Sequence, residues 1–308
     1  MARRAKESGS TDLTERVGAW NAKQFRTQKR PNTSVGSNRI GRIREICRAN
    51  IGLVFLPLEY RPITMLKKSI PNALTLMNLG SGVLAIIAAF QEAWSLTFLF
   101  FVLCLVLDFL DGGVARALKV QSELGKQLDS LSDVVSFGVL PALVMFLYII
   151  PYYPEWNIGR VLSEGRWEEF LPLVAVLVPM STALRLGRFN LMESSTYFLG
   201  LPSPANALLL MSIPMILRSD KSPEALLVFL ANPYTLAAIC LFSTFLLNAP
   251  FRLFTLKFKG GSFQENIVPI LFLIAALVLL LTLGYLGIPL IIMLYIGMSL
   301  LGVNKKQA

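Results

Sequence analysis

Four aspartates in two neighbouring segments form the pattern with the clearest chemical meaning. Asp108 and Asp111 are three residues apart, and Asp129 and Asp133 are four residues apart. Side chains at these spacings lie on one face of a helix. The segment 117–128 is long enough to turn the chain back. We therefore expect two antiparallel helices that present four carboxylates to one point.

Carboxylates gathered inside a membrane need a cationic partner. Each ionised side chain costs roughly 2.5–3.5 kcal/mol at the centre of a bilayer, and like charges also repel one another. Arg116 alone cannot balance four of them. One or two divalent ions can, and Mg²⁺ is usually bound by carboxylates together with substrate phosphates. We predict Mg²⁺ or Mn²⁺ as cofactor, with two ions able to clamp the attacking and leaving oxygens of a phosphoryl displacement.

Small residues accompany the aspartates. Gly112 and Ala115 leave part of a helix surface bare, and Gly125 does the same at the turn, so that a flat ligand can approach the backbone. Close packing between membrane helices is the alternative explanation. Because the sequence contains no histidine, general-base chemistry has to rely on a carboxylate, a lysine or a tyrosine.

The composition is typical of a polytopic helical membrane protein. Of the 308 residues, 54% are hydrophobic and 16% are charged, whereas a soluble domain carries about 25% charged residues. We predict an all-α bundle of about eight transmembrane helices. Their expected ranges are 71–90, 95–116, 128–150, 171–190, 203–217, 233–250, 267–283 and 286–302.

Basic residues divide unevenly between the two sides of this bundle. Eight spans place both termini on one side, which receives most of the lysines and arginines. The other side receives only Arg160, Arg166, Arg218 and Lys221. Because basic loops remain in the cytoplasm, we predict that both termini are cytoplasmic. The aspartates then face the cytoplasm from an integral cell-membrane protein.

The chain divides into three regions by composition. Residues 1–64 carry 13 basic and 5 acidic side chains, as in a disordered tail that lies on an anionic leaflet. Alternatively this segment is not native, since Met65 looks like a natural start. In either case we expect its deletion to leave activity largely intact. We assign residues 65–265 to a catalytic helical domain, and 266–308 to two further helices with a short basic tail.

The aspartate run, D-x2-D-G-x2-A-R-x8-G-x3-D-x3-D, resembles the signature of the CDP-alcohol phosphatidyltransferases. Further runs are similar to the bacterial branch of that family that makes phosphatidylserine, and the resemblance covers about 66–265. They read SIPNALTLMNLGSG, ALRLGRFNL, FLGLPSPANA and FLLNAPFRLFTLKFKG. The resemblance implies transfer of the phosphatidyl group of CDP-diacylglycerol to the hydroxyl of L-serine. The products would be phosphatidylserine and CMP.

The resemblance also implies roles for individual residues. Asp133 would be both a metal ligand and the general base, and Arg116 would contact the diphosphate. Arg185 and Arg188 would bind an anion, either the carboxylate of serine or a lipid phosphate, although they could equally be snorkelling membrane anchors. The remaining metal ligands would be Asp108, Asp111 and Asp129, and the cytidine diphosphate pocket would be lined by Asn72, Thr75, Gly112, Ala115 and Gly125.

Several alternatives remain open from the sequence. Within the family, the acceptor could be glycerol-3-phosphate or inositol phosphate, and the donor could be an archaeal ether lipid. In another class, a divalent-cation transporter also places aspartates in membrane helices. The expected partners are membrane lipid, CDP-diacylglycerol and L-serine, without nucleic acid. The oligomeric state is open, with a homodimer as one option.

Overall fold

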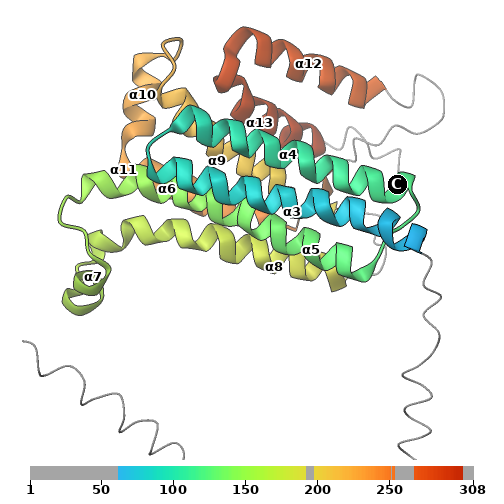
Figure 1. The fold of residues 1–308 in the computed structure, drawn as a ribbon. Coiled ribbons are helices and arrows are strands. Elements are labelled where there is room, and N and C mark those ends of the chain that lie inside the picture. The colour runs from blue at the N-terminus through green and yellow to red at the C-terminus, as the bar shows by residue number, and fades with distance from the viewer. Residues whose placement is uncertain (1–61, 192–197, 251, 254–266, 301–308) are drawn as a thin grey trace, which may run out of the picture. The chain divides into compact units, whose positions relative to one another are not determined.

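The computed structural model describes residues 62–191, 198–250, 252–253 and 267–300, which form a bundle of helices (Figure 1). Most of the basic segment 1–64, including its predicted role as a tail, therefore lies outside the described residues. Apart from one pair of two-residue strands, the regular elements that are described are all helical. This confirms the prediction of an all-α fold.

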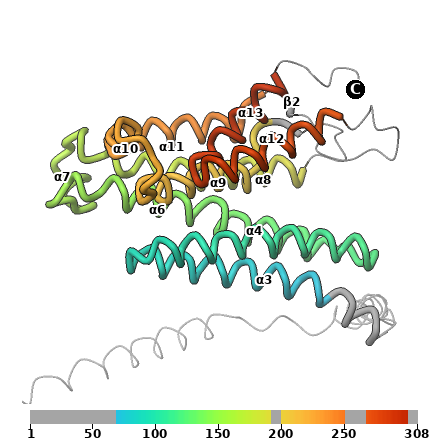
Figure 2. The backbone as a smooth tube through the Cα atoms, turned by 90° about the horizontal axis from the view of Figure 1, so that it is seen from above, coloured from blue at the N-terminus to red at the C-terminus, as the bar shows by residue number. Residues whose placement is uncertain are grey.

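A long hairpin opens the bundle. Helices α3 (Pro62–Phe90) and α4 (Trp94–Ala117) are joined by a tight turn in which Glu92 has a φ of 56°. The two helices lie side by side along their length in both views (Figures 1 and 2). The carboxyl end of α4, which carries the first two aspartates, therefore lies beside the amino-terminal half of α3.

A second long helical run follows the hairpin. Ser122 caps it, because its hydroxyl accepts a hydrogen bond from the amide of Gly125 at 3.1 Å. The run is α-helical at first, becomes a π-helix directly after Asp133, and then returns to α-helix. Its parts are α5 (Glu123–Asp133), η1 (Val134–Val139), α6 (Leu140–Ile149) and the 3-10 turn η2 (Ile150–Tyr152).

The remaining elements complete the bundle around this run. Strands β1 and β2 pair in antiparallel fashion, and Leu201 N donates to Leu246 O at 2.8 Å beside them. The elements are α7 (Ile158–Glu164), η3 (Trp167–Val176), α8 (Leu177–Leu191), β1 (Phe198–Leu199), α9 (Ser203–Leu217), α10 (Glu224–Ala231), α11 (Pro233–Asn248), β2 (Arg252–Leu253), α12 (Ile267–Leu283), η5 (Gly284–Leu286) and α13 (Gly287–Leu300).

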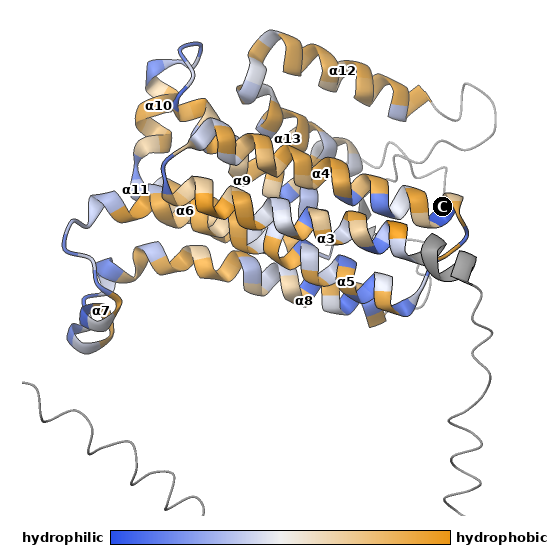
Figure 3. Ribbon diagram, in the orientation of Figure 1, coloured by the Kyte–Doolittle hydropathy of each residue, from blue (hydrophilic) through white to orange (hydrophobic). Residues whose placement is uncertain are grey.

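Hydrophobic residues predominate along the helices of the bundle, as a bilayer requires (Figure 3). Large side chains such as Phe109, Phe245 and Leu281 are 63–75% exposed, which in water would be an aggregation hazard. Among the described residues, five helical segments are long and apolar enough to cross a membrane. The number is six if the pair α10 and α11, bent by 77°, counts as one span.

Each of the eight predicted ranges overlaps helix in the structure, although α11 ends at Asn248, before the predicted end at 250, and 301–302 lie outside the described residues. The short helix α9 falls below the length of a full span, and α12 to α13 form one apolar stretch from 267 to 300. The total of eight crossings and the cytoplasmic location of both termini therefore stay predictions. The structure also adds two helices that the sequence analysis did not predict, α7 and α10.

Basic side chains at the two ends of the bundle have different partners. At one end, Lys126 Nζ donates to Asn190 O at 3.1 Å and so joins the start of α5 to the end of α8. At the other end, the guanidinium of Arg218 lies 5.6 Å from the centre of the Trp94 ring. Figure 1 shows α7 and α10 at this second end, away from the start of α5.

Candidate active site

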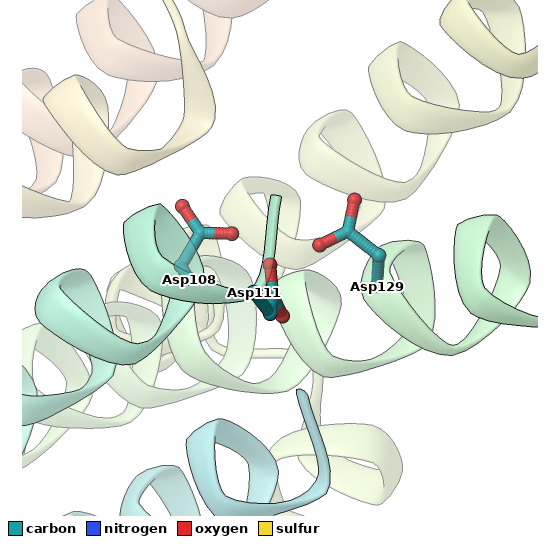
Figure 4. A group of neighbouring side chains, drawn as sticks. All are labelled: Asp108, Asp111 and Asp129. Carbon is teal, nitrogen blue, oxygen red and sulfur yellow. The ribbon is translucent and has the colours of Figure 1, made fainter. Parts of the chain in front are cut away.

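Three of the four aspartates converge at the end of the bundle where α4 finishes and α5 begins. Asp108 and Asp111 come from α4 and Asp129 comes from α5, and one carboxylate oxygen of each lies within 4.8 Å of the others. Figure 4 shows the three side chains close together, with Asp108 and Asp129 on either side of Asp111. Both members of the first pair and one member of the second therefore converge, and their oxygens are close enough to share a metal ion.

The fourth aspartate lies just beside this group. Asp133 ends α5, one turn beyond Asp129, and is only 8% exposed. It is close enough to Asp108 and Asp129 for their charges to interact. Its Oδ1 atom is buried and has no hydrogen-bond partner within the described part of the chain. A buried carboxylate oxygen without a partner is costly, so this atom is available to a proton or a ligand.

Helix α3 positions the aspartates by contacting both helices that carry them. The hydroxyl of Thr75 donates to Asp111 Oδ2 at 2.5 Å, and the carbonyl of Thr75 accepts from Ser132 Oγ at 3.2 Å. One turn further along, Ser136 Oγ donates to Asn78 Oδ1 at 2.9 Å. Thr75, Ser132, Asn78 and Ser136 are all buried. A single helix thus fixes the first pair of aspartates relative to the second.

A cavity of about 520 Å³ opens beside the aspartates. Its volume lies within the usual range for small-molecule sites. It borders eight of the predicted site residues and six that the sequence analysis did not single out. The predicted ones are Asn72, Thr75, Asp111, Gly112, Ala115, Arg116, Gly125 and Asp129, and the additional ones are Pro71, Val120, Gln121, Ser122, Glu123 and Lys126.

Most of the additional residues belong to one short stretch, 120–126, that covers the end of the connection from α4 and the first turn of α5. The sequence signal was present, because this stretch separates the two halves of the aspartate motif. Gly125 shows why the connection is tight. A Cβ atom there would lie 3.1 Å from Asn72 Oδ1 and 3.2 Å from Ser122 Oγ. Glycine thus allows the start of α5 to approach α3 beside the cavity.

The two arginines near the end of α8 occupy different surroundings, and neither lines the cavity. Arg185 is partly buried, and its Nη1 donates to the hydroxyl of Ser203 on α9 at 2.8 Å. It is also close enough to Asp133 for their charges to interact. Arg188 is exposed and is 3.5 Å from Asn248 Oδ1. Of the pair, Arg185 is the one that faces the aspartates.

The arrangement fits a divalent cation. The ion pairs found among the described residues lie at the opposite end of the bundle, between Arg160 or Arg166 and the acidic side chains near them. None of them neutralises the four aspartates. The donor set is made only of carboxylate oxygens, which hard cations such as Mg²⁺ and Mn²⁺ prefer. These aspartates could therefore hold such an ion, with Asp133 at the edge of the group.

Comparison with known proteins points to one family. A sequence model of the CDP-alcohol phosphatidyltransferases matches residues 68–246. The chain is 32% identical over 146 residues to the CDP-diacylglycerol–serine O-phosphatidyltransferase of Mycobacterium tuberculosis H37Rv, covering 45% of this chain and 46% of that protein. The protein of the same name from Methanocaldococcus jannaschii is 35% identical over 152 residues, with coverages of 49% and 63%.

A third relative bears a different name. The archaetidylserine synthase of Methanothermobacter thermautotrophicus is 31% identical over 148 residues, with coverages of 47% and 57%. The matched regions thus span about half the length of these curated relatives. All the aspartates described above fall inside the stretch that the family model matches.

Proposed function

The chain belongs to the CDP-alcohol phosphatidyltransferase family, and we propose that it transfers the phosphatidyl group of CDP-diacylglycerol to L-serine. The observation that carries this proposal is the group of three carboxylates, within 4.8 Å of one another, beside a cavity of about 520 Å³. The names of the relatives supply the serine acceptor.

The cavity offers suitable chemistry for the nucleotide end of the donor. Arg116 and Lys126 border it and can bind the diphosphate through charge-assisted hydrogen bonds. Gly112, Ala115 and Gly125 leave space for a flat group close to the backbone. In this arrangement the cytidine lies against the 120–126 stretch, and the diphosphate points toward the aspartates.

The aspartates would hold one or two Mg²⁺ or Mn²⁺ ions through Asp108, Asp111 and Asp129, with Asp133 as a further ligand. When bound, such ions would neutralise the charge of the diphosphate and stabilise the charge that builds up on it during transfer. Thr75 restrains the carboxylate of Asp111 through its 2.5 Å hydrogen bond, which limits the orientations that this ligand can adopt.

The transfer also needs a group that accepts a proton. The hydroxyl of serine forms a bond to the lipid-side phosphorus, and the bond from that phosphorus to the bridging oxygen breaks, so that CMP leaves. We assign the hydroxyl proton to Asp133, whose Oδ1 is buried without a hydrogen-bond partner in the described ranges. No histidine exists in the chain to take that role.

The location of the site supports a cytoplasmic reaction at the membrane. Arg116, Lys126, Arg185 and Arg188 lie at the end of the bundle that carries the aspartates. Arg218 lies at the other end with Arg160 and Arg166, and the last two are paired with acidic side chains. By the positive-inside tendency, the aspartate end faces the cytoplasm of the cell membrane. CDP-diacylglycerol would then reach the cavity from the lipid, and serine from the water.

The donor has one alternative with its own support. A relative named archaetidylserine synthase is consistent with an ether lipid in place of the diacyl lipid. The residues described here surround the polar part of the donor, which the two lipids share. The family match leaves the transporter alternative without a supporting observation.

A direct assay tests the proposal. The purified full chain in detergent is given CDP-diacylglycerol with serine, glycerol-3-phosphate or inositol phosphate, each with Mg²⁺, Mn²⁺ or a chelator. We expect phosphatidylserine and CMP in equal amounts, from serine alone and only with a divalent ion. Product from a phosphorylated acceptor instead, or metal-independent turnover, would overturn the serine or the metal assignment respectively.

A further inference from the structure

Asn206 on α9 is a buried polar residue that the proposed reaction does not yet use. Its side chain is fully buried, and neither its Oδ1 nor its Nδ2 has a hydrogen-bond partner in the described part of the protein. Buried amides are nearly always hydrogen-bonded, because leaving them unpaired is costly. A carboxamide with both ends free therefore indicates a ligand position.

The packing of α9 places Asn206 near the aspartates. Ser203, three residues earlier on the same face, accepts the hydrogen bond from Arg185. Ala207, the next residue, packs in one core cluster with Cys104 of α4 and Phe137 of η1. Asn206 therefore lies between this apolar layer and the contact with Arg185.

The neighbouring helices carry aspartates on the site side of the same apolar layer. Asp108 is four residues after Cys104 on α4, and Asp133 is four residues before Phe137. The two aspartates are thus about one turn from the apolar layer, on the side toward the end of the bundle that holds the site. Arg185 Nε and Asp133 Oδ1 are also buried without partners in the same described region. Arg185 connects the other two elements, because it is close enough to Asp133 for their charges to interact and it donates to Ser203, one turn before Asn206 on α9.

We propose that Asn206, Arg185 and Asp133 form the acceptor subsite and that Asn206 selects for a zwitterionic amino acid. This inference rests on the proposed function, because it names the groups that would recognise the acceptor. Arg185, held in place by Ser203, binds the carboxylate through its free Nε. Asn206 Oδ1 accepts a hydrogen bond from the ammonium group, and the hydroxyl points to Asp133. A phosphorylated polyol has no ammonium group and would leave Asn206 unpaired.

The test compares Asn206→Leu with the unmodified full chain. Leucine is similar in size and removes the unpaired polar atoms. We expect the KM for serine to rise roughly 10- to 100-fold, the loss of one hydrogen bond to a charged group. The KM for CDP-diacylglycerol should change less than about twofold. Without ligand, the Tm should stay level or rise, because an unsatisfied amide has been removed.

Two further measurements separate recognition from a structural effect. Ser212→Ala is the matched control, because Ser212 is buried on the same helix and its hydroxyl donates only to Leu209 O within that helix. It should leave the serine KM unchanged. The second measurement uses 3-hydroxypropanoate, which lacks the ammonium group. Its inhibition constant should be the same for the unmodified chain and Asn206→Leu. If the leucine variant does not fold, Asn206→Ala replaces it.

The outcomes distinguish this inference from the proposed function. Stabilisation of the full chain by L-serine is measured as a rise in Tm, independently of turnover. If the unmodified chain is stabilised by serine and makes phosphatidylserine, but Asn206→Leu keeps the same serine KM, the subsite is wrong and the function stands. If the unmodified chain shows neither serine binding nor product, both the proposed function and this inference are wrong.

Discussion

The hydrogen bond between Thr75 and Asp111 offers a sharp test of how the metal site is built. We predict that Thr75→Val raises the divalent-ion concentration that the enzyme needs about 10- to 100-fold, as loss of a group that orients a ligand commonly does. Valine keeps nearly the same shape and removes only the hydroxyl.

The structure sets this magnitude. The hydroxyl lies 2.5 Å from Asp111 Oδ2, and Thr75 is 3% exposed, so that water cannot replace the lost donor. A hydrogen bond to a charged group contributes about 1.5–3 kcal/mol. At about 1.4 kcal/mol for each factor of ten, this corresponds to the predicted range.

The assay is a titration with Mn²⁺ and with Mg²⁺ of chelator-treated protein. Half-maximal activity gives one reading, and the rise in Tm caused by the metal gives another that does not depend on turnover. Thr97→Val is the control, since Thr97 is 1% exposed and its hydroxyl donates to Ala93 O within its own helix. If both variants need the same metal concentration as the unmodified chain, the hydroxyl does not position a ligand.

Three further predictions concern other parts of the site. Asp133→Asn should keep most of the affinity for CDP-diacylglycerol and lose turnover by roughly 10²- to 10⁴-fold; rescue of turnover by excess metal alone would leave this residue as a ligand only. Arg185→Ala should raise the KM for serine more than it raises the KM for CDP-lipid. It should also raise the serine KM more than Arg188→Ala does, because Arg188 is exposed, and equal serine kinetics for the two variants would contradict this. Gly125→Ala should weaken CDP-lipid binding roughly tenfold, as crowding of about 1–3 kcal/mol implies, whereas Gly113→Ala, with nothing within 4 Å of the new Cβ, should leave binding unchanged.

Much of the fold and the core of the site could be predicted from local sequence patterns. The spacing of Asp108, Asp111 and Asp129 specifies helix faces directly, and hydropathy marks long apolar helices whatever their packing. The eight predicted ranges therefore all overlap helix. Whether each helix crosses the bilayer depends on its packing and on the thickness of the membrane. The sequence of a short apolar helix such as 203–217 does not determine either of these.

The parts that could not be predicted depend on contacts between distant residues. Nothing in the sequence near Thr75 says that it meets Asp111 36 positions later, and nothing near Asn206 says that its amide is left without a partner. The helix α10 was missed for a different reason. Pro233 restricts the residue before it, and Asn232 caps α11 by accepting from Tyr234 N at 2.9 Å, so the predicted range 233–250 begins at the right residue. The helix before this break has only 8 residues, which is too short to be recognised as a membrane span.

The π-helical turn directly after Asp133 changes the direction in which the side chains of α6 point relative to those of α5. The amide of Leu140 donates to the carbonyl of Val135, five residues back, so that this turn contains one residue more than an α-helical turn. Each residue of a helix advances it by about 100°. Deleting a single residue here would restore ordinary α-helical bonding, but it would rotate the apolar face of α6 by about that angle relative to the carboxylates of α5. The additional residue therefore sets the angle between the two faces. It allows the carboxylates of α5 to face α4 while Leu140 and Val144 of α6 pack in the core.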